Sequence, residues 1–262
     1  MLTIRSRHFQ ANFDAATGNW EGLLTRKDST PLLGRGPALD LQIDGNFWFT
    51  NTSRQISATR YFAEGRGAAF ICEVDGIRIT HAIELDAALP IMYQSVDLQD
   101  IEATERPPRQ LTGVVYQLPG FVVGDPQACL LYAPDQGIPE SPYPEAAALL
   151  SDAGRQAAPA YLAGWPQPAE GQNPGLVAVE NTVQHRLASC WLRSENAKTF
   201  TTVCARNEQG AAVIDVAQRQ QLSGWLKPGV TLISQGFSLL VTDGSLEQHL
   251  AQFQRYAYEE IW

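Results

Sequence analysis

Apolar and polar residues alternate along many short segments of the chain, which is the pattern of half-buried β-strands. The pattern is clearest in residues 77–85, where isoleucine, histidine or leucine occupies every odd position. Arginine, threonine or glutamate occupies most of the even positions. One face of this segment is therefore expected to be buried and the other to be exposed or partly covered.

The same alternation and the turn signals between segments predict strands over most of the sequence. In the first part of the chain they fall at residues 9–13, 20–25, 39–43, 55–62, 68–74, 77–85 and 91–101. In the last part they fall at residues 176–180, 186–193, 199–205, 212–222 and 231–241. So many short strands do not fit one flat sheet. We predict a mainly β protein, a large antiparallel β-sandwich, with residues 1–262 forming a single domain.

Two segments depart from this pattern. Residues 119–174 are rich in proline and contain several glycines, which predicts an irregular insert. Residues 245–260 predict a helix, because Ser245 and Gln248 fit a capping box. The apolar positions of that helix form one stripe, which consists of Leu246, Leu250, Phe253 and Ala257.

Composition narrows the classes of partner. The net charge of −9 disfavours nucleic acid and anionic membranes, which both bind basic surfaces. The N-terminal residues do not resemble a secretory signal, so we expect either a cytoplasmic protein or one from which an export signal has been removed. The cysteines are scattered without a metal-ligand spacing, so we expect buried thiols and no metal site or cofactor.

Candidate acid–base residues are few. His81 lies on the apolar face of its strand and is expected to be a hydrogen-bonded core residue, whereas His249 lies off the stripe of its helix and is expected to be solvated. Glu180 and His185 fall around a predicted hairpin turn and could act as general acid and base. Turns are commonly rich in such polar residues, so a structural role is the alternative for this pair.

Aromatic residues give the candidate ligand contacts. Trp48 follows a predicted hairpin, while Tyr143 and Trp165 lie in the proline-rich insert. Each could stack on a sugar ring, or could pack against the core or against a neighbouring domain.

The order of several short motifs resembles a known fold family. These motifs are Phe13-Asp14 with Thr17-Gly18, then Asp44-Gly45, Val74-Asp75-Gly76, Val96-Asp97-Leu98, and Leu226-Lys227-Pro228-Gly229 before a strand and a helix with Phe253 and Tyr256. Together they resemble the galactose-mutarotase-like β-supersandwich found at the N-terminus of multidomain bacterial glycoside hydrolases. The resemblance covers most of the chain and implies a helical catalytic domain as a neighbour.

The sequence also departs from the free-standing aldose epimerases of this type. Those enzymes carry a histidine in an asparagine-rich strand motif and a late catalytic glutamate, and residues 231–241 here contain no carboxylate. The resemblance therefore implies a non-catalytic accessory or carbohydrate-binding domain associated with a glycoside hydrolase. A stand-alone sugar epimerase or sugar-binding protein, and a structural interaction domain without a ligand, are the alternatives.

Overall fold

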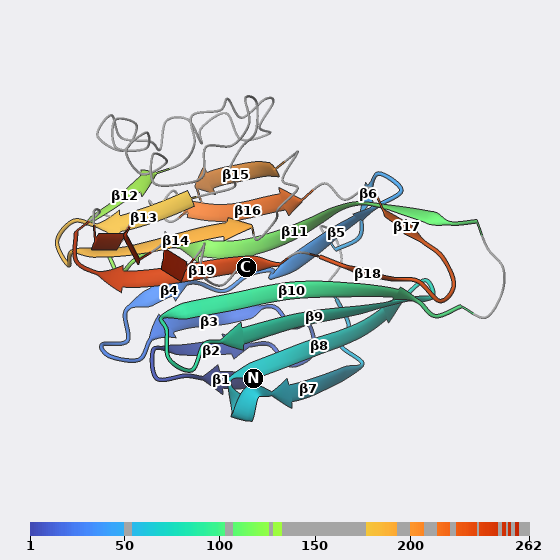
Figure 1. Cartoon of the computed structure of the whole chain (residues 1–262), viewed down its shortest axis with the longest axis horizontal. Coiled ribbons are helices and arrows are strands. Elements are labelled where there is room, and N and C mark those ends of the chain that lie inside the picture. The colour runs from blue at the N-terminus through green and yellow to red at the C-terminus, as the bar shows by residue number, and fades with distance from the viewer. Residues whose placement is uncertain are drawn as a thin grey trace.

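The computed structural model of the chain describes residues 1–49, 54–102, 107–125, 128–132, 177–192, 200–206, 214–220, 224–234, 236–245, 248–249, 251–252 and 255–256. Antiparallel strands make up most of these residues (Figure 1). A short 3-10 turn, η1 (Ala63–Gly65), joins β7 to β8.

The described strands form three sheets. The nine-stranded sheet runs β12 (Cys129–Tyr132), β13 (Val177–Asn181), β14 (Arg186–Leu192), β19 (Phe237–Asp243), β10 (Ile91–Asp100), β9 (Ile77–Leu85), β8 (Gly67–Val74), β7 (Ala58–Phe62), with β18 (Thr231–Ile233) also on β10. The six-stranded sheet runs β15 (Phe200–Arg206), β16 (Ile214–Gln220), β11 (Arg109–Phe121), β5 (Leu39–Ile43), β6 (Asn46–Phe47), with β17 (Gly224–Leu226) on β11. The four-stranded sheet runs β1 (Leu2–Arg5), β2 (Phe9–Phe13), β3 (Trp20–Thr25), β4 (Pro31–Leu33).

The two smaller sheets meet edge to edge and form one layer opposite the nine-stranded sheet. Val122 N, just after β11, donates to Leu32 O of β4 at 3.0 Å. Across the layers, the rings of Phe13 and Phe70 lie 5.0 Å apart, and those of Tyr116 and Phe237 lie 5.6 Å apart. The side chains between the layers form one hydrophobic cluster, so the predicted antiparallel β-sandwich is confirmed.

Strand β11 is the longest described strand, and the sequence pattern did not predict it. The Pro119-Gly120 pair resembles the start of an irregular segment, but both residues lie within β11. The register of β11 against β16 shifts between Leu118 and Phe121, which is a β-bulge. A bulge accommodates a proline that cannot donate to the ladder. Regular structure therefore continues past residue 119, and the remainder of the expected insert, residues 133–174, lies outside the described residues.

The segment predicted as one strand at 231–241 is two strands, β18 and β19. Both pair with the same edge of β10, and the register shifts by one residue between them. Ser234 lies at this bulge, where its N–H donates to Val96 O at 2.8 Å and its hydroxyl accepts from Val96 N at 2.9 Å. The same hydroxyl is hydrogen-bonded to the Tyr116 hydroxyl, which ties the bulge to the other layer.

The start of the C-terminal helix is as predicted, although its apolar stripe lies outside the described residues. Gln248 N donates to Ser245 Oγ at 3.3 Å, and Ser245 N donates to Gln248 Oε1 at 3.0 Å, which is a reciprocal capping box. Residues 248–249, 251–252 and 255–256 are helical. They lie over β14 and β19, on the face of the nine-stranded sheet that points away from the core (Figure 1).

The expectation that His249 is solvated is wrong. Its side chain is fully buried, with Nδ1 2.5 Å from Thr242 Oγ1 and Nε2 2.9 Å from Ser189 Oγ. Both hydroxyls lie on the outer face of the sheet, so the hydrogen bonds of His249 link the helix to β14 and β19. The face that a helix buries against a sheet is wider than its apolar stripe, and a histidine with two hydroxyl partners can occupy its margin.

His81 is a core histidine, as predicted. Arg54 Nη1 donates to its Nδ1 at 3.3 Å, so the Nε2–H group donates to Gln94 Oε1 at 2.9 Å. Burial, reinforced by the Arg54 cation, lowers the pKa of His81 to about 3. Of the predicted buried thiols, Cys72 and Cys190 lie in the core, Cys129 is partly buried, and the side chain of Cys204 lies outside the described residues.

We expect the bulge before β19 to require glycine at position 236. Gly236 has φ of +85°, and a Cβ there would lie 2.9 Å from the Gln94 carbonyl oxygen. Gly236→Ala should lower the free energy of unfolding by about 2–3 kcal/mol in urea denaturation, since it adds a clash to the backbone strain. Gly45→Ala is the control, because Gly45 has φ of +78° but open space around it, and about 1 kcal/mol is expected. If the two variants lower the free energy of unfolding equally, the bulge has room for a side chain at position 236.

Candidate functional site

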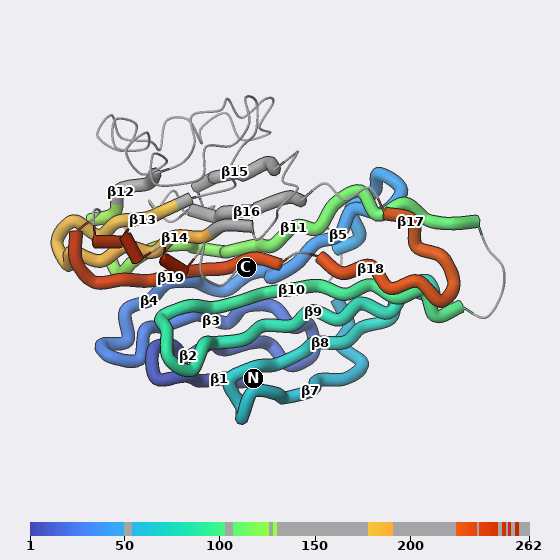
Figure 2. Tube along the Cα trace, viewed as in Figure 1, coloured from blue at the N-terminus to red at the C-terminus, as the bar shows by residue number. Residues whose placement is uncertain are grey.

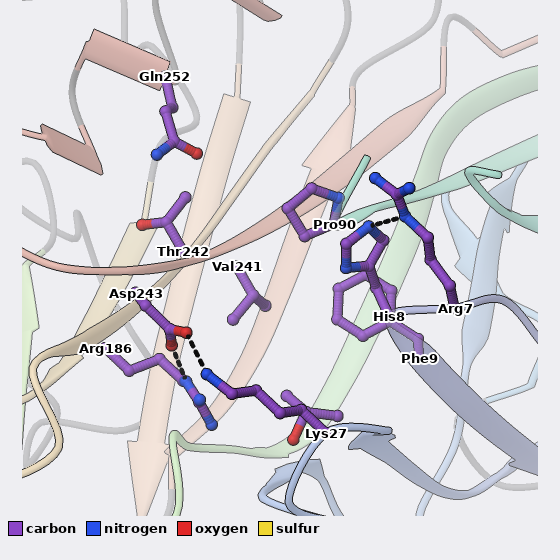
Figure 3. A pocket seen from close by; sticks show the side chains of 11 residues that line it. Arg7, His8, Phe9, Lys27, Pro90, Arg186, Val241, Thr242, Asp243 and Gln252 are labelled. Carbon is purple, nitrogen blue, oxygen red and sulfur yellow. Dashed lines mark hydrogen bonds and ion pairs between the residues drawn. The ribbon is translucent and has the colours of Figure 1, made fainter. Parts of the chain in front are cut away.

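Turns from several strands gather at one end of the sandwich. The connections β1–β2, β3–β4, β9–β10 and β13–β14 all lie there, together with the end of β19 (Figure 2). A pocket of about 310 Å³ opens among them. It is lined by Arg7, His8, Phe9, Thr25, Lys27, Pro90, Arg186, Val241, Thr242, Asp243 and Gln252 (Figure 3).

Each of these four turns is held by a polar side chain that accepts backbone N–H bonds within the turn. Such local bonds favour a turn over continued strand. The four residues and their donors are Ser6 with His8 N and Phe9 N, Asp28 with Thr30 N, Asp86 with Ala88 N and Leu89 N, and Asn181 with Val183 N and Gln184 N. The pocket is therefore built on ordered turns.

The floor of the pocket is apolar and its rim is polar. Phe9 and Val241 are buried core residues, and Pro90 lies beside them (Figure 3). The backbone fixes this arrangement, since Val241 N donates to Pro90 O at 3.0 Å. Gln252, from the C-terminal helix, lies on the opposite side of the pocket (Figure 3).

Arg186 lies at the centre of the charged wall of the pocket, which it forms with Asp28 and Asp243. Its side chain is only 8% exposed, with Nε 2.6 Å from Asp243 Oδ1 and Nη1 2.8 Å from Asp28 Oδ2. Nη1 also donates to Thr30 Oγ1 at 2.9 Å. Two carboxylates around one buried guanidinium form a charge-assisted network with fixed geometry.

Both carboxylates are held in the ionised form. Burial acts to raise the pKa of Asp28, but hydrogen bonds from Thr25, Thr30 and Arg186 outweigh it and hold that pKa well below the usual range. The hydrogen bond from Arg186 is the main cause that lowers the pKa of Asp243. At neutral pH these groups accept hydrogen bonds and donate none.

The rim carries more cations than carboxylates. Lys27 Nζ lies 3.2 Å from Asp243 Oδ2, but the lysine side chain is 77% exposed, so this ion pair contributes little stability. The exposed Arg7 donates from Nε to His8 Nε2 at 2.8 Å and from Nη2 to the Ala88 carbonyl oxygen. With Arg186 the cluster has three cations against the two carboxylates of Asp28 and Asp243. It is a local positive excess in a chain whose net charge is −9.

The two residues of the predicted acid–base pair lie on different elements. Glu180 lies on β13 opposite Leu187, on the face away from the core. His185 is exposed in the following turn with φ of +51°, and its carbonyl oxygen accepts from Gly244 N at 2.7 Å. The backbone of His185 thus joins the β13–β14 turn to the end of β19. A catalytic role for either residue stays a prediction.

The predicted aromatic contacts lie away from this pocket or outside the described residues. Trp48 is half-buried against the core, and the Arg109 guanidinium lies 5.6 Å from its ring centroid. Tyr143 and Trp165 fall in the part of the chain that the structure does not describe. Trp225, on β17, is 54% exposed and was not singled out from the sequence.

Sequence reasoning also missed the residues of the pocket. Arg7, Lys27, Arg186 and Asp243 come from four separate segments, and each resembles an ordinary turn residue. Among the described residues, no group of three or more histidine, cysteine or acidic side chains is placed to hold a metal ion. No helix in the described part of the chain is long and apolar enough to cross a membrane.

Comparison with known proteins identifies the fold. No family model matches the sequence, and no curated protein compared with it is similar in sequence. The galactose mutarotase related enzyme from Lactobacillus acidophilus superposes with a TM-score of 0.56 at 8% identity, over 93% of this chain and 97% of that chain. A polysaccharide lyase superposes with a TM-score of 0.53 at 11% identity, over 96% of this chain and 35% of that chain.

A third structure is the GH36 α-galactosidase AgaA from Geobacillus stearothermophilus. It superposes with a TM-score of 0.50 at 9% identity, over 99% of this chain and 42% of that chain. The same arrangement of strands thus occurs both as nearly a whole chain and as part of a longer one. The chain has the galactose-mutarotase-like fold, as the order of its sequence motifs predicts.

Proposed function

We propose that this chain is a non-catalytic carbohydrate-binding domain that acts as an accessory to a glycoside hydrolase. The observation that carries the proposal is the pocket at the turn end of a galactose-mutarotase-like sandwich. Pro90, which is partly exposed at the apolar floor beside the buried Phe9 and Val241, suits the C–H face of a sugar ring. The rim of amide, hydroxyl and charged groups suits the ring hydroxyls.

The chemistry of the pocket favours binding over acid–base catalysis. Glycoside hydrolysis uses a carboxylic acid whose pKa is raised so that it can donate a proton. Here the lining carboxylate Asp243 and its neighbour Asp28 have lowered pKa values, because hydrogen bonds stabilise their ionised forms. His81 and His249 are buried and do not line the pocket, and His8, which does, accepts a hydrogen bond from Arg7 Nε at its Nε2.

An accessory role is supported by the longer chains that contain this fold. The superposition covers 42% of the chain of the α-galactosidase AgaA and 35% of the chain of the polysaccharide lyase. In such an arrangement the partner would be a helical catalytic domain, and the pocket would hold carbohydrate beside it. A stand-alone sugar epimerase is the second candidate, since the chain also corresponds to 97% of a galactose mutarotase related enzyme.

Two measurements on the purified chain test the proposal. Calorimetric titration with galactose, glucose, glucuronate and glucose 6-phosphate should show at least one sugar bound with a dissociation constant of about 1 mM or tighter. Polarimetry of freshly dissolved α-galactose should show no acceleration of mutarotation by the protein. Acceleration would support the epimerase instead, and absence of binding to every sugar would contradict a carbohydrate-binding domain.

A further inference from the structure

We propose that the pocket selects acidic sugars, meaning pyranoses that carry a carboxylate or a phosphate. The inference rests on the proposed carbohydrate binding and adds the chemical class of the ligand. The anionic group would lie against Lys27 and Arg7, and the ring would lie over Phe9, Pro90 and Val241.

The charge of the rim is the first reason. Arg186 is buried and held by Asp28 and Asp243, whereas Lys27 and Arg7 are exposed and each retains N–H donors. Arg7 directs its hydrogen bonds to the His8 ring and to the Ala88 carbonyl, and neither of these partners is a carboxylate. Lys27 and Arg7 line the pocket on opposite sides of His8 (Figure 3), and an anion at this rim would receive charge-assisted hydrogen bonds from both once these exposed side chains turn toward it.

An exchange of partners at Asp243 is the second reason. The exposed pair of Lys27 Nζ with Asp243 Oδ2 is weak, so Lys27 can turn to a ligand anion at little cost. That movement releases Oδ2 to accept a ring hydroxyl, while Arg186 still holds Oδ1 at 2.6 Å. A neutral sugar supplies no anion to replace Asp243 as the partner of Lys27, so it would gain less from this exchange.

The rigidity of the remaining wall is the third reason. Arg186 is buried and makes three polar contacts, and the floor residues belong to the core. Only the exposed cations need to move when the ligand enters. A site with most of its geometry set in advance loses little conformational entropy on binding.

The test is calorimetric titration of the full chain with glucuronate, glucose 6-phosphate, glucose, acetate and inorganic phosphate. We expect at least one acidic sugar to bind ten-fold or more tightly than glucose, acetate or phosphate. Raising the salt concentration should weaken this binding. The two acidic sugars distinguish a carboxylate from a phosphate as the preferred anion.

Variants assign the binding to the pocket. Lys27→Met and Arg7→Met should each weaken binding of the acidic sugar about ten-fold. Lys227→Met removes an exposed lysine from the β17–β18 turn, away from the pocket residues, and should leave affinity unchanged. Thermal unfolding of the three variants controls for stability, since all three side chains are exposed.

The outcomes separate this inference from the proposed function. Glucose that binds as tightly as the acidic sugars, or acidic-sugar binding that survives both pocket variants, would overturn the selectivity and leave carbohydrate binding intact. Acetate or phosphate that binds as tightly as the acidic sugars would reduce the site to an anion site and overturn the inference. Failure of every sugar to bind would remove the proposed function itself.

Discussion

Lowering the pH from 6 to 4 is expected to reduce the free energy of unfolding by about 5 kcal/mol. Burial lowers the pKa of both His81 and His249 to about 3, whereas an unfolded histidine titrates near its model value of 6.5. Each histidine stays neutral in the folded protein and takes up a proton on unfolding. Its stabilising contribution is complete above pH 6.5 and is lost as the pH falls toward 3.

Urea denaturation at closely spaced pH values measures this dependence. We expect the free energy of unfolding to change by about 2–3 kcal/mol per pH unit near pH 5, which corresponds to the uptake of two protons on unfolding. His81→Gln and His249→Gln should each reduce the slope by about half, whatever their effect on stability at neutral pH. A slope near zero between pH 6 and 4 would contradict burial of the two neutral rings.

Replacing Arg186 with methionine is expected to lower the free energy of unfolding at pH 7 by about 2–4 kcal/mol. The substitution keeps an unbranched apolar stem but removes the guanidinium and its hydrogen bonds to Asp28, Asp243 and Thr30. The two carboxylates are left near each other with less neutralising charge. They are 42% and 55% exposed, so water offsets part of the loss.

The effect of Arg186→Met should also depend on pH. Asp28 and Asp243 have lowered pKa values, so their contribution is present above the unfolded value near 3.8 and is lost as the pH falls through the folded values. The difference between variant and natural protein should therefore shrink below about pH 4. Arg35→Met is the matched control, since Arg35 is 78% exposed in its ion pair with Glu21 and should cost less than about 1 kcal/mol. If Arg186→Met and Arg35→Met lower the free energy of unfolding at neutral pH by similar amounts, the buried network of Arg186 does not stabilise the fold more than an exposed ion pair does.

Local sequence signals predicted those parts of the fold that depend on neighbours in the chain. The alternation at residues 77–85 gives β9 with its observed bounds. The Asp-Gly dipeptides at 44–45 and 75–76 form two-residue turns with positive φ at both positions. The capping box of Ser245 and Gln248 is a signal of the same kind.

Features that depend on distant partners could not be predicted in this way. Strand β11 contains Pro119-Gly120, and this pair forms a bulge only through the pairing of β11 with β16. The burial of His249 depends on the Thr242 and Ser189 hydroxyls, which the sheet brings to one place. A single sequence shows neither the register of these strands nor which of their faces the helix covers.

The same reason explains why the pocket was missed. Residues 7, 27, 186 and 243 are separated along the chain, and they meet because antiparallel strands return their turns to one end of the sandwich. Aromatic residues could be predicted as sugar contacts because stacking on a sugar ring requires an aromatic side chain, which is recognisable in a sequence. Charged residues around an apolar pocket form no recognisable sequence motif, because they are ordinary turn residues.

Backbone amide chemical shifts of isotope-labelled protein would locate the carbohydrate site. During titration with galactose and glucuronate, we expect the largest shifts at the amides of His8, Lys27 and Asp243, around the pocket. Shifts concentrated near Trp48 or Trp225, or no shifts with either sugar, would contradict the assignment of carbohydrate binding to this end of the sandwich.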